Sequence, residues 1–327
     1  MAKANAEFSD IGNAFASIND ASAEKPYLLL VEPGIYQTEN IVVKNSVHIM
    51  GSGKKATKLE CDGCGFVLSW FGNGDLNITI SNLSIVNTGG ANGVNFVDFG
   101  DICTVTLDSV EVRVSNGAGG PSAAISGSSC NMEISKADTF GSAADGNAAY
   151  DVYVADTVSL TLKDSLLGAA AGEPSAAILT TNDDYVELKD LDIGIKGGSS
   201  ASMLHNVYGV SVMGKKSGVA GHYFDDIRID VTARYPVAVR ALNGANVKIA
   251  DSRLHANTLD EKNGASFALQ VEGTETNGSS TFSGEARVAT SELKGIRRCI
   301  SGCARICVIQ SYTDAFTALP DGCAGPN

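Results

Sequence analysis

The sequence predicts an all-β chain that folds as a solenoid, and three observations support this prediction. Glycine is frequent, with 36 residues among 327, whereas the chain has only 7 prolines and 6% aromatic residues, a mixture suited to many turns between short strands. A short motif recurs along most of the chain at a nearly constant interval. The sequence between the motifs contains apolar stretches of strand length. Repeats of this kind are typical of solenoids, in which each repeat forms one coil.

Composition and charge exclude several classes of protein. The chain has 44% apolar and 19% charged residues, as folded globular chains do, and its formal net charge is −13. This negative charge disfavours anionic partners, so we predict that the protein does not bind nucleic acid. No stretch approaches the roughly 18 consecutive apolar residues of a membrane span. Met1–Glu24 also lacks the apolar run of a signal peptide, so we expect that a leader was either removed or never present.

The first element is expected to be a helix. Ile11, Phe15 and Ile18 are spaced as on one face of a helix, and Ser9 is the expected N-cap. An amphipathic helix at this end would cover the open core of the first coil. We therefore interpret residues 1–25 as an N-terminal segment with a capping helix.

The repeat motif starts with an apolar residue and reads as a strand. A second apolar strand precedes most copies of the motif, so each coil offers about three strands. Two long intervals, around Ile195–His222 and Asn257–Ser283, predict enlarged loops on one flank, where binding often occurs. The copies begin at Ile80, Leu107, Ile134, Leu162, Leu188, Phe224, Ile249 and Val288, separated by 27, 27, 28, 26, 36, 25 and 39 residues.

A short polar residue follows the leading apolar position in most copies. Such side chains bond to nearby backbone and tolerate left-handed backbone geometry, so they predict a tight corner in each coil. Stacked coils would place them one above another at the strand spacing of about 4.8 Å. These residues are Asn82, Asp108 (one place early), Asp164, Asp190, Asp226 and Asp251.

The cysteines are few for this length and indicate local disulfides in an oxidising compartment, hence an extracellular or cell-surface location. Cys103 and Cys130 each precede their motif by four residues, where neighbouring copies have Leu76 and Val158, which indicates an inward-facing column. We favour two free buried thiols there, with a disulfide between adjacent coils as the alternative. The other disulfide candidates are Cys61 with Cys64, and Cys299, Cys303, Cys307 and Cys323 in a predicted C-terminal cap over residues 299–327.

Two segments carry a family resemblance. The run Pro26–Gly53 (PYLLLVEPGIYQTENIVVKNSVHIMGSG) resembles the opening of right-handed parallel β-helix proteins of the pectin-lyase-like superfamily. The segment Cys307–Cys323 (CVIQSYTDAFTALPDGC) is similar to the closing segment of bacterial secreted β-helix proteins that mostly lack an assigned function. The resemblance covers nearly the whole chain and implies a single-stranded right-handed parallel β-helix of about nine or ten coils over residues 26–298. It implies no single activity, because this architecture hosts lyases, hydrolases, esterases, epimerases, phage tailspikes and adhesins.

The catalytic patterns of this superfamily are only faintly present. Lyases of the family would imply a tryptophan motif ending in Asp-His, but Trp70 is the one tryptophan and no Asp-His pair exists. Hydrolases of the polygalacturonase type would imply four short motifs, which Asn182-Asp183-Asp184, Gly221-His222-Tyr223 and Arg228-Ile229-Asp230 echo with departures. Paired carboxyl groups could perform acid and base catalysis if they converged on one bond, although strand-end turns explain them better. The catalytic candidates are Asp183, Asp184, Asp225, Asp226 and His222.

No cofactor is predicted. The histidines lack the spacing of zinc ligands, and Cys299, Cys303 and Cys307 at helical spacing fit a disulfide cap better than a metal site. Calcium on the acidic turns stays open, because oxygen ligands are abundant but no loop signature defines a site.

The sequence favours binding over catalysis. Outward strand positions are dominated by Ser, Thr, Asn, Gly and Ala, which predicts flat, polar flanks. Tyr185, Tyr208, Tyr223 and Tyr235 are the ligand-binding candidates, with ordinary strand packing as the alternative. We therefore predict a non-catalytic extracellular or surface protein, structural or adhesive, that presents loops to a partner or polysaccharide. The alternatives are a polysaccharide-degrading lyase or glycoside hydrolase, and a phage tailspike. The oligomeric state is not predicted.

Overall fold

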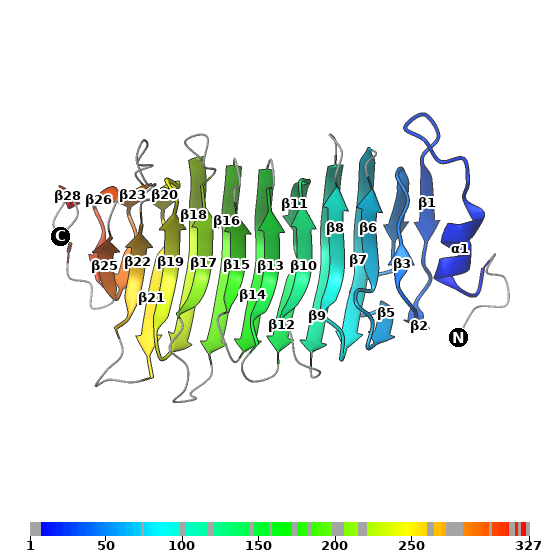
Figure 1. Cartoon of the computed structure of the whole chain (residues 1–327), viewed down its shortest axis with the longest axis horizontal. Coiled ribbons are helices and arrows are strands. Elements are labelled where there is room, and N and C mark those ends of the chain that lie inside the picture. Colours follow the sequence, from blue (N-terminus) through cyan, green and yellow to red (C-terminus); the bar gives the residue numbers. More distant parts are fainter. Residues whose placement is uncertain are drawn as a thin grey trace, which may run out of the picture.

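The computed structural model describes residues 8–72, 75–98, 103–116, 121–143, 147–156, 159–171, 175–181, 185–197, 206–214, 221–259, 265–272, 284–300, 303–313, 318–319 and 322–324. Over these ranges the chain is a right-handed parallel β-helix, as predicted. Its coils stack along one long axis, with helix α1 (Ile11–Ser17) at the N-terminal end (Figure 1). The described part contains no helix long and apolar enough to cross a membrane.

Two sheets form the wall of the solenoid, and their named strands pair in parallel except where β26 meets β28. The ten-stranded sheet contains β3 (Ile41–Val42), β6 (Leu68–Gly72), β8 (Asn92–Asp98), β10 (Ser122–Ser128), β13 (Ala149–Ala155), β15 (Ala176–Thr181), β17 (Val207–Met213), β19 (Pro236–Leu242), β22 (Phe267–Val271) and β25 (Ile296–Cys299). The large sheet contains β1 (Tyr27–Leu30), β2 (Gly34–Gln37), β4 (Val47–Met50), β5 (Thr57–Asp62), β7 (Leu76–Thr88), β9 (Cys103–Asn116), β11 (Asn131–Ser135), β12 (Asp138–Ala143), β14 (Ser159–Ala171), β16 (Tyr185–Gly197), β18 (Gly221–Ala233), β20 (Asn246–Ala250), β21 (Arg253–Thr258), β23 (Gly284–Ala289), β24 (Glu292–Lys294), β26 (Cys303–Ile309), β27 (Tyr312–Thr313) and β28 (Gly322–Ala324).

The large sheet bends sharply at one residue in each coil, where the backbone is left-handed. This confirms the corner predicted from the repeat, because short polar side chains tolerate that geometry. In β9 the bend falls on Ser109, one residue after Asp108, which explains the shifted position of that aspartate in the motif. The corner residues are Asn82, Ser109, Lys136, Asp164, Asp190, Asp226, Asp251, Thr290 and Gln310, with φ between 48° and 56°.

The core lies inside the coils, where inward-facing residues stack in columns across successive strands. Because side chains alternate between the two faces of a strand, one of every two consecutive residues points inward and is buried. One such column runs through Ile78, Val105, Met132, Leu160, Val186, His222 and Val247, all at most 2% exposed.

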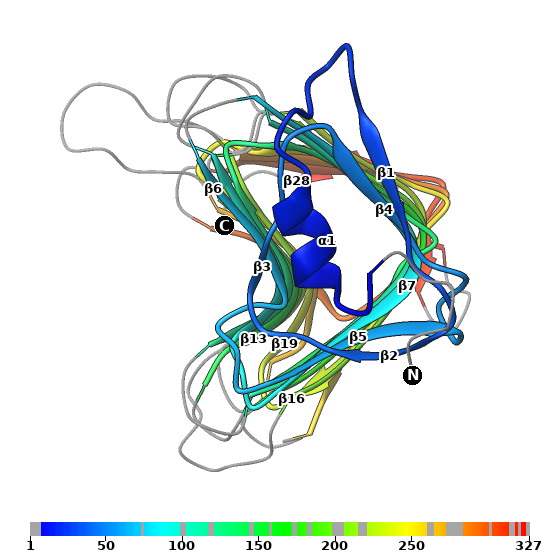
Figure 2. The ribbon, with the colours of Figure 1, turned by 90° about the vertical axis from the view of Figure 1, so that its right-hand side faces the viewer.

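Helix α1 lies over the N-terminal opening of the solenoid (Figure 2). Its apolar face buries Ile11 and Phe15, and Ile18 is buried just after it, as the spacing predicts. The N-cap is Asp10, whose carboxylate accepts a hydrogen bond from the Asn13 N–H at 2.7 Å. The prediction of Ser9 as the N-cap is wrong, because the helix begins one residue later than that cap requires.

Disulfides join Cys61 to Cys64, Cys103 to Cys130 and Cys307 to Cys323. The interpretation of Cys103 and Cys130 as free thiols is wrong. Both are buried in one inward column of adjacent coils, as expected, but their Cα atoms lie 4.6 Å apart, within disulfide reach. Cys299 is also disulfide-bonded. The side chain of Cys303 and the whole of Val158 lie outside the described residues.

Candidate functional site

The outer face of the ten-stranded sheet is concave, because the sheet curves toward the axis of the solenoid (Figure 2). A pocket of about 630 Å³ lies on this face, over β8, β10, β13 and β15. It is lined by Ala91, Asn92, Asn95, Asn116, Pro121, Ser122, Ala123, Ser126, Tyr150, Tyr153, Leu179 and Thr181.

Two tyrosines of β13 dominate this pocket. The ring centroids of Tyr150 and Tyr153 lie 5.5 Å apart, with their planes inclined by 34°. Residues three apart in a regular strand face opposite sides of the sheet, whereas both tyrosines line the pocket. The strand accommodates this because Asp151 and Val152, between them, are both buried. We name this feature the tyrosine pocket.

The polar groups of the tyrosine pocket are neutral. The Ser126 hydroxyl donates to Asn95 Oδ1 at 2.8 Å, which orients the amide of Asn95. Burial, assisted by the neighbouring Tyr153 hydroxyl, raises the pKa of Tyr150 above its ordinary value, so its hydroxyl is protonated at neutral pH. None of the described residues that line the pocket carries a formal charge. Aromatic faces combined with amide and hydroxyl groups suit a ligand that is polar but uncharged, such as a sugar ring.

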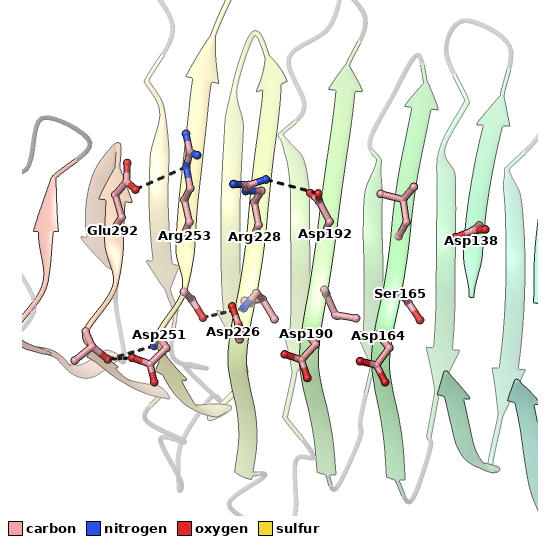
Figure 3. A pocket seen from close by; sticks show the side chains of 15 residues that line it. Asp138, Asp164, Ser165, Asp190, Asp192, Asp226, Arg228, Asp251, Arg253 and Glu292 are labelled. Atoms are coloured by element: carbon pink, nitrogen blue, oxygen red, sulfur yellow. Dashed lines mark hydrogen bonds and ion pairs between the residues drawn. The ribbon is translucent and has the colours of Figure 1, made fainter. Parts of the chain in front are cut away.

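A second surface, the acidic groove, follows the corner of the large sheet and has a volume of about 600 Å³. Figure 3 shows one row of aspartates along the corner and a second row in which Arg253 and Arg228 lie side by side between Glu292 and Asp192. In the second row Arg228 lies 3.9 Å from Asp192, and Arg253 lies 3.8 Å from Glu292. Carboxyl groups outnumber guanidinium groups in the groove, so its field repels anions. Its charged residues are Asp138, Asp164, Asp190, Asp192, Asp226, Arg228, Asp251, Arg253 and Glu292.

Among the predicted catalytic residues that the structure describes, Asp225 and Asp226 are neighbours in β18, whereas His222 of the same strand is buried. Asp226 lines the acidic groove, and Asp225 is half-buried next to it in β18, on a different sheet from the tyrosine pocket. Asp183 and Asp184 lie outside the described residues, and in the chain they follow Thr181, which lines the tyrosine pocket.

His222 faces the core and lines neither surface. Its side chain is 2% exposed, and its two ring nitrogens have no hydrogen-bond partner among the described residues. Burial lowers the pKa of His222 from 6.5 to about 4, so the ring is neutral at neutral pH. A histidine in this position packs inside the coils, away from both surfaces.

The four tyrosines predicted to bind a ligand do not form one site. Tyr185 and Tyr223 are 40% and 37% exposed on the outer face of the large sheet. Tyr208 lies in β17 of the ten-stranded sheet and accepts a hydrogen bond from Arg240 at 2.8 Å, and Tyr235 packs beneath Arg234 just before β19.

The four predicted tyrosines do not include Tyr150 and Tyr153, which regular alternation along β13 would place on opposite faces. The signal that could have revealed the tyrosine pocket is Asp151, a charged residue where the aligned strands have Gly or Ala. The predicted enlarged loops lie largely outside the described residues. Within the described residues, no group of three or more His, Cys, Asp or Glu side chains is arranged to hold a metal ion.

Comparison with known proteins supports the fold. No family model and no curated protein matches the chain. Among solved structures, the chain is similar to the A-module of the mannuronan C-5 epimerase AlgE4 from Azotobacter vinelandii, with a TM-score of 0.50 and 14% identity over 93% of this chain and 91% of that one. It is also similar to the pectin methylesterase PemA from Erwinia chrysanthemi, with a TM-score of 0.35 and 10% identity over 98% and 90% of the two chains. The chain has the right-handed parallel β-helix fold, as the resemblance implies.

Proposed function

We propose that this chain is a secreted or surface β-helix protein that binds a neutral polysaccharide in the tyrosine pocket. The observation that carries this proposal is the Tyr150–Tyr153 pair in an uncharged pocket on the concave sheet. The disulfides support an oxidising compartment, outside the cytoplasm.

The chemistry of the pocket supports a neutral sugar over a uronic acid. A carboxylate ligand is normally held by Arg or Lys, and no described residue lining the pocket is cationic. The face of a tyrosine ring packs against the C–H groups of a sugar, while Asn95 and Ser126 offer hydrogen bonds to its hydroxyl groups. The net charge of −13 further disfavours an acidic polymer.

A carbohydrate ligand narrows the prediction from the sequence, in which a structural or adhesive protein presents loops to a partner or polysaccharide. The chain shares its fold with the module of an enzyme named for its action on mannuronan. This likeness supports a carbohydrate-directed role better than a scaffold without a ligand, although it does not indicate the same reaction.

Hydrolysis of the bound polymer is a second candidate function. Glycoside hydrolysis normally requires two carboxyl groups at the scissile bond, and the described lining of the pocket supplies none. Thr181 lines the pocket, and Asp183 and Asp184 follow it closely in the chain. These two aspartates are therefore the candidate acids for such a reaction.

Retention on immobilised polysaccharides tests the proposal. We expect the protein to be retained on at least one neutral glucan, mannan or galactan, and less on pectate or alginate, with or without calcium. Tyr153→Ala should weaken retention by about tenfold, because the pocket loses one aromatic face. Tyr223→Ala is the matched control, since this tyrosine stands on the other sheet, and it should bind as the wild type does.

Retention confined to acidic polymers, or unchanged by Tyr153→Ala, would rule out the neutral-polysaccharide site. Reducing ends released from the retained polymer, and abolished by Asp183→Asn or Asp184→Asn, would establish hydrolysis in addition to binding.

A further inference from the structure

One inward position of the ten-stranded sheet has a small residue in each strand from β8 to β22 except β13. The flanking residues fix the alignment, because Tyr150 pairs with Ala123 and Ala176, and Val152 pairs with Ile125 and Ile178. The aligned residues are Gly93, Ala124, Asp151, Ala177, Gly209, Ala238 and Ala268. The tyrosine pocket is therefore built on the strand that carries the exception, Asp151.

The carboxyl group of Asp151 is enclosed by the protein. The side chain has no exposed surface, and its Oδ1 accepts a hydrogen bond from the Gly141 N–H at 2.8 Å. Its Oδ2 has no hydrogen-bond partner among the described residues. Burial raises the pKa of Asp151 well above the ordinary carboxyl range, and the Gly141 hydrogen bond opposes this only in part.

Gly141 is the counterpart of Asp151 on β12. It aligns with larger inward residues of neighbouring coils, and a Cβ atom added to it would lie 2.3 Å from the Tyr150 carbonyl oxygen. The backbone of Tyr150 thus approaches β12 more closely than a side chain at position 141 permits. The residues aligned with Gly141 are Val114, Ala169, Ile195, Val231 and Ala256.

Packing alone does not explain why this coil has a carboxyl side chain at position 151 and no side chain at position 141. The next coil fills the same space with Ala169 and Ala177, which need no buried polar group. Burying a carboxyl group with one oxygen unpartnered costs free energy. A departure of this kind from the pattern of the neighbouring coils is typical of functional sites.

We propose that Asp151 is a positioning residue of the tyrosine pocket. Through its hydrogen bond to Gly141, it ties β13 to β12 from behind the pocket and sets the depth and mutual angle of the rings of Tyr150 and Tyr153. This inference rests on the proposed function of the same pocket.

Two substitutions at one position test the role. Asp151→Ala introduces the residue that β10 and β15 have at this position, so we expect it to fold and to be retained about tenfold less on the neutral polysaccharide that binds the wild type. Asp151→Asn keeps the volume and the acceptor for the Gly141 N–H, and it should retain affinity within about twofold. Ala238→Gly, at the aligned position of β19, is the matched control and should bind as the wild type does.

Wild-type retention of a folded Asp151→Ala variant would overturn the inference, as would an equal loss in Asp151→Asn. The proposed function fails separately, when the wild-type protein is retained on no neutral polymer. In that event the crystal structure of Asp151→Ala decides: a changed separation of the Tyr150 and Tyr153 rings supports the positioning role, and an unchanged 5.5 Å rejects it.

Discussion

Cys103 and Cys130 are joined by a disulfide that links two adjacent coils from inside the solenoid. The bond closes a loop of 27 residues and restricts the unfolded chain. We predict that the Cys103→Ala/Cys130→Ala double variant loses about 3–4 kcal/mol of unfolding free energy, as expected for a loop of this length.

Urea unfolding at neutral pH measures this loss. Cys61→Ala/Cys64→Ala is the control, because that disulfide closes a loop with a sequence separation of only 3 and should contribute much less. Equal effects of the two double variants would contradict the prediction.

His222 is predicted to destabilise the protein in mild acid. Its pKa falls from 6.5 to about 4 on folding, so the unfolded chain binds the proton more tightly. The free energy of unfolding should therefore decrease by up to about 3 kcal/mol as the pH falls from 6.5 toward 4. His222→Val matches the Val186 and Val247 neighbours of the column and should flatten this part of the pH dependence. Chemical denaturation at several pH values tests this, and an unchanged slope in the variant would refute it.

Asp151 is predicted to act in the opposite direction. Because burial raises its pKa above the ordinary value of 3.8, the folded state holds the proton more tightly than the unfolded chain. Its contribution to the unfolding free energy should decline as the pH rises above 3.8. Asp151→Asn should be at least as stable as the wild type at pH 7 and lack this decline. Stability curves of the two proteins between pH 4 and 8 that run parallel would disprove the assignment.

The stacked aspartates of the corner should repel one another at low ionic strength. Asp190 stands between Asp164 and Asp226 in successive coils of the acidic groove. Asp190→Asn removes one charge and keeps a side chain that tolerates the left-handed backbone, as Asn82 does at the equivalent corner. We expect its melting temperature to rise by about 1–2 °C in low salt and the gain to vanish in about 0.5 M NaCl. A gain that persists in high salt would show that charge repulsion is not the cause.

Much of the architecture is predictable because it follows from local rules repeated along the chain. The interval between motifs sets the coil, and residues such as Asp164 and Asp226 mark its corner because few other side chains accept a left-handed backbone. The helical spacing of Ile11, Phe15 and Ile18 predicts the capping helix, because it places the three apolar side chains on one face. The sequence predicts the helix start one residue too early, because Ser9 and Asp10 are both good N-caps.

The candidate site depends on contacts between coils, which local rules do not determine. Alternation along β13 places Tyr150 and Tyr153 on opposite faces, and only the stacking against β10 and β15 shows that Asp151 and Val152 both turn inward. His222 is equally compatible with a surface or a core position until its neighbours Val186 and Val247 are known.

The sequence by itself determined that this protein is a solenoid, because repeated apolar strands and polar corners bury a continuous core when the coils stack, and its resemblance to known proteins implied a parallel β-helix. The tertiary structure alone decided that Cys103 bonds to Cys130, that His222 is buried, and that two tyrosines share one pocket. The bond, the burial and the pocket each depend on which residues of adjacent coils lie side by side. The register and the local bends of the stacked strands decide this.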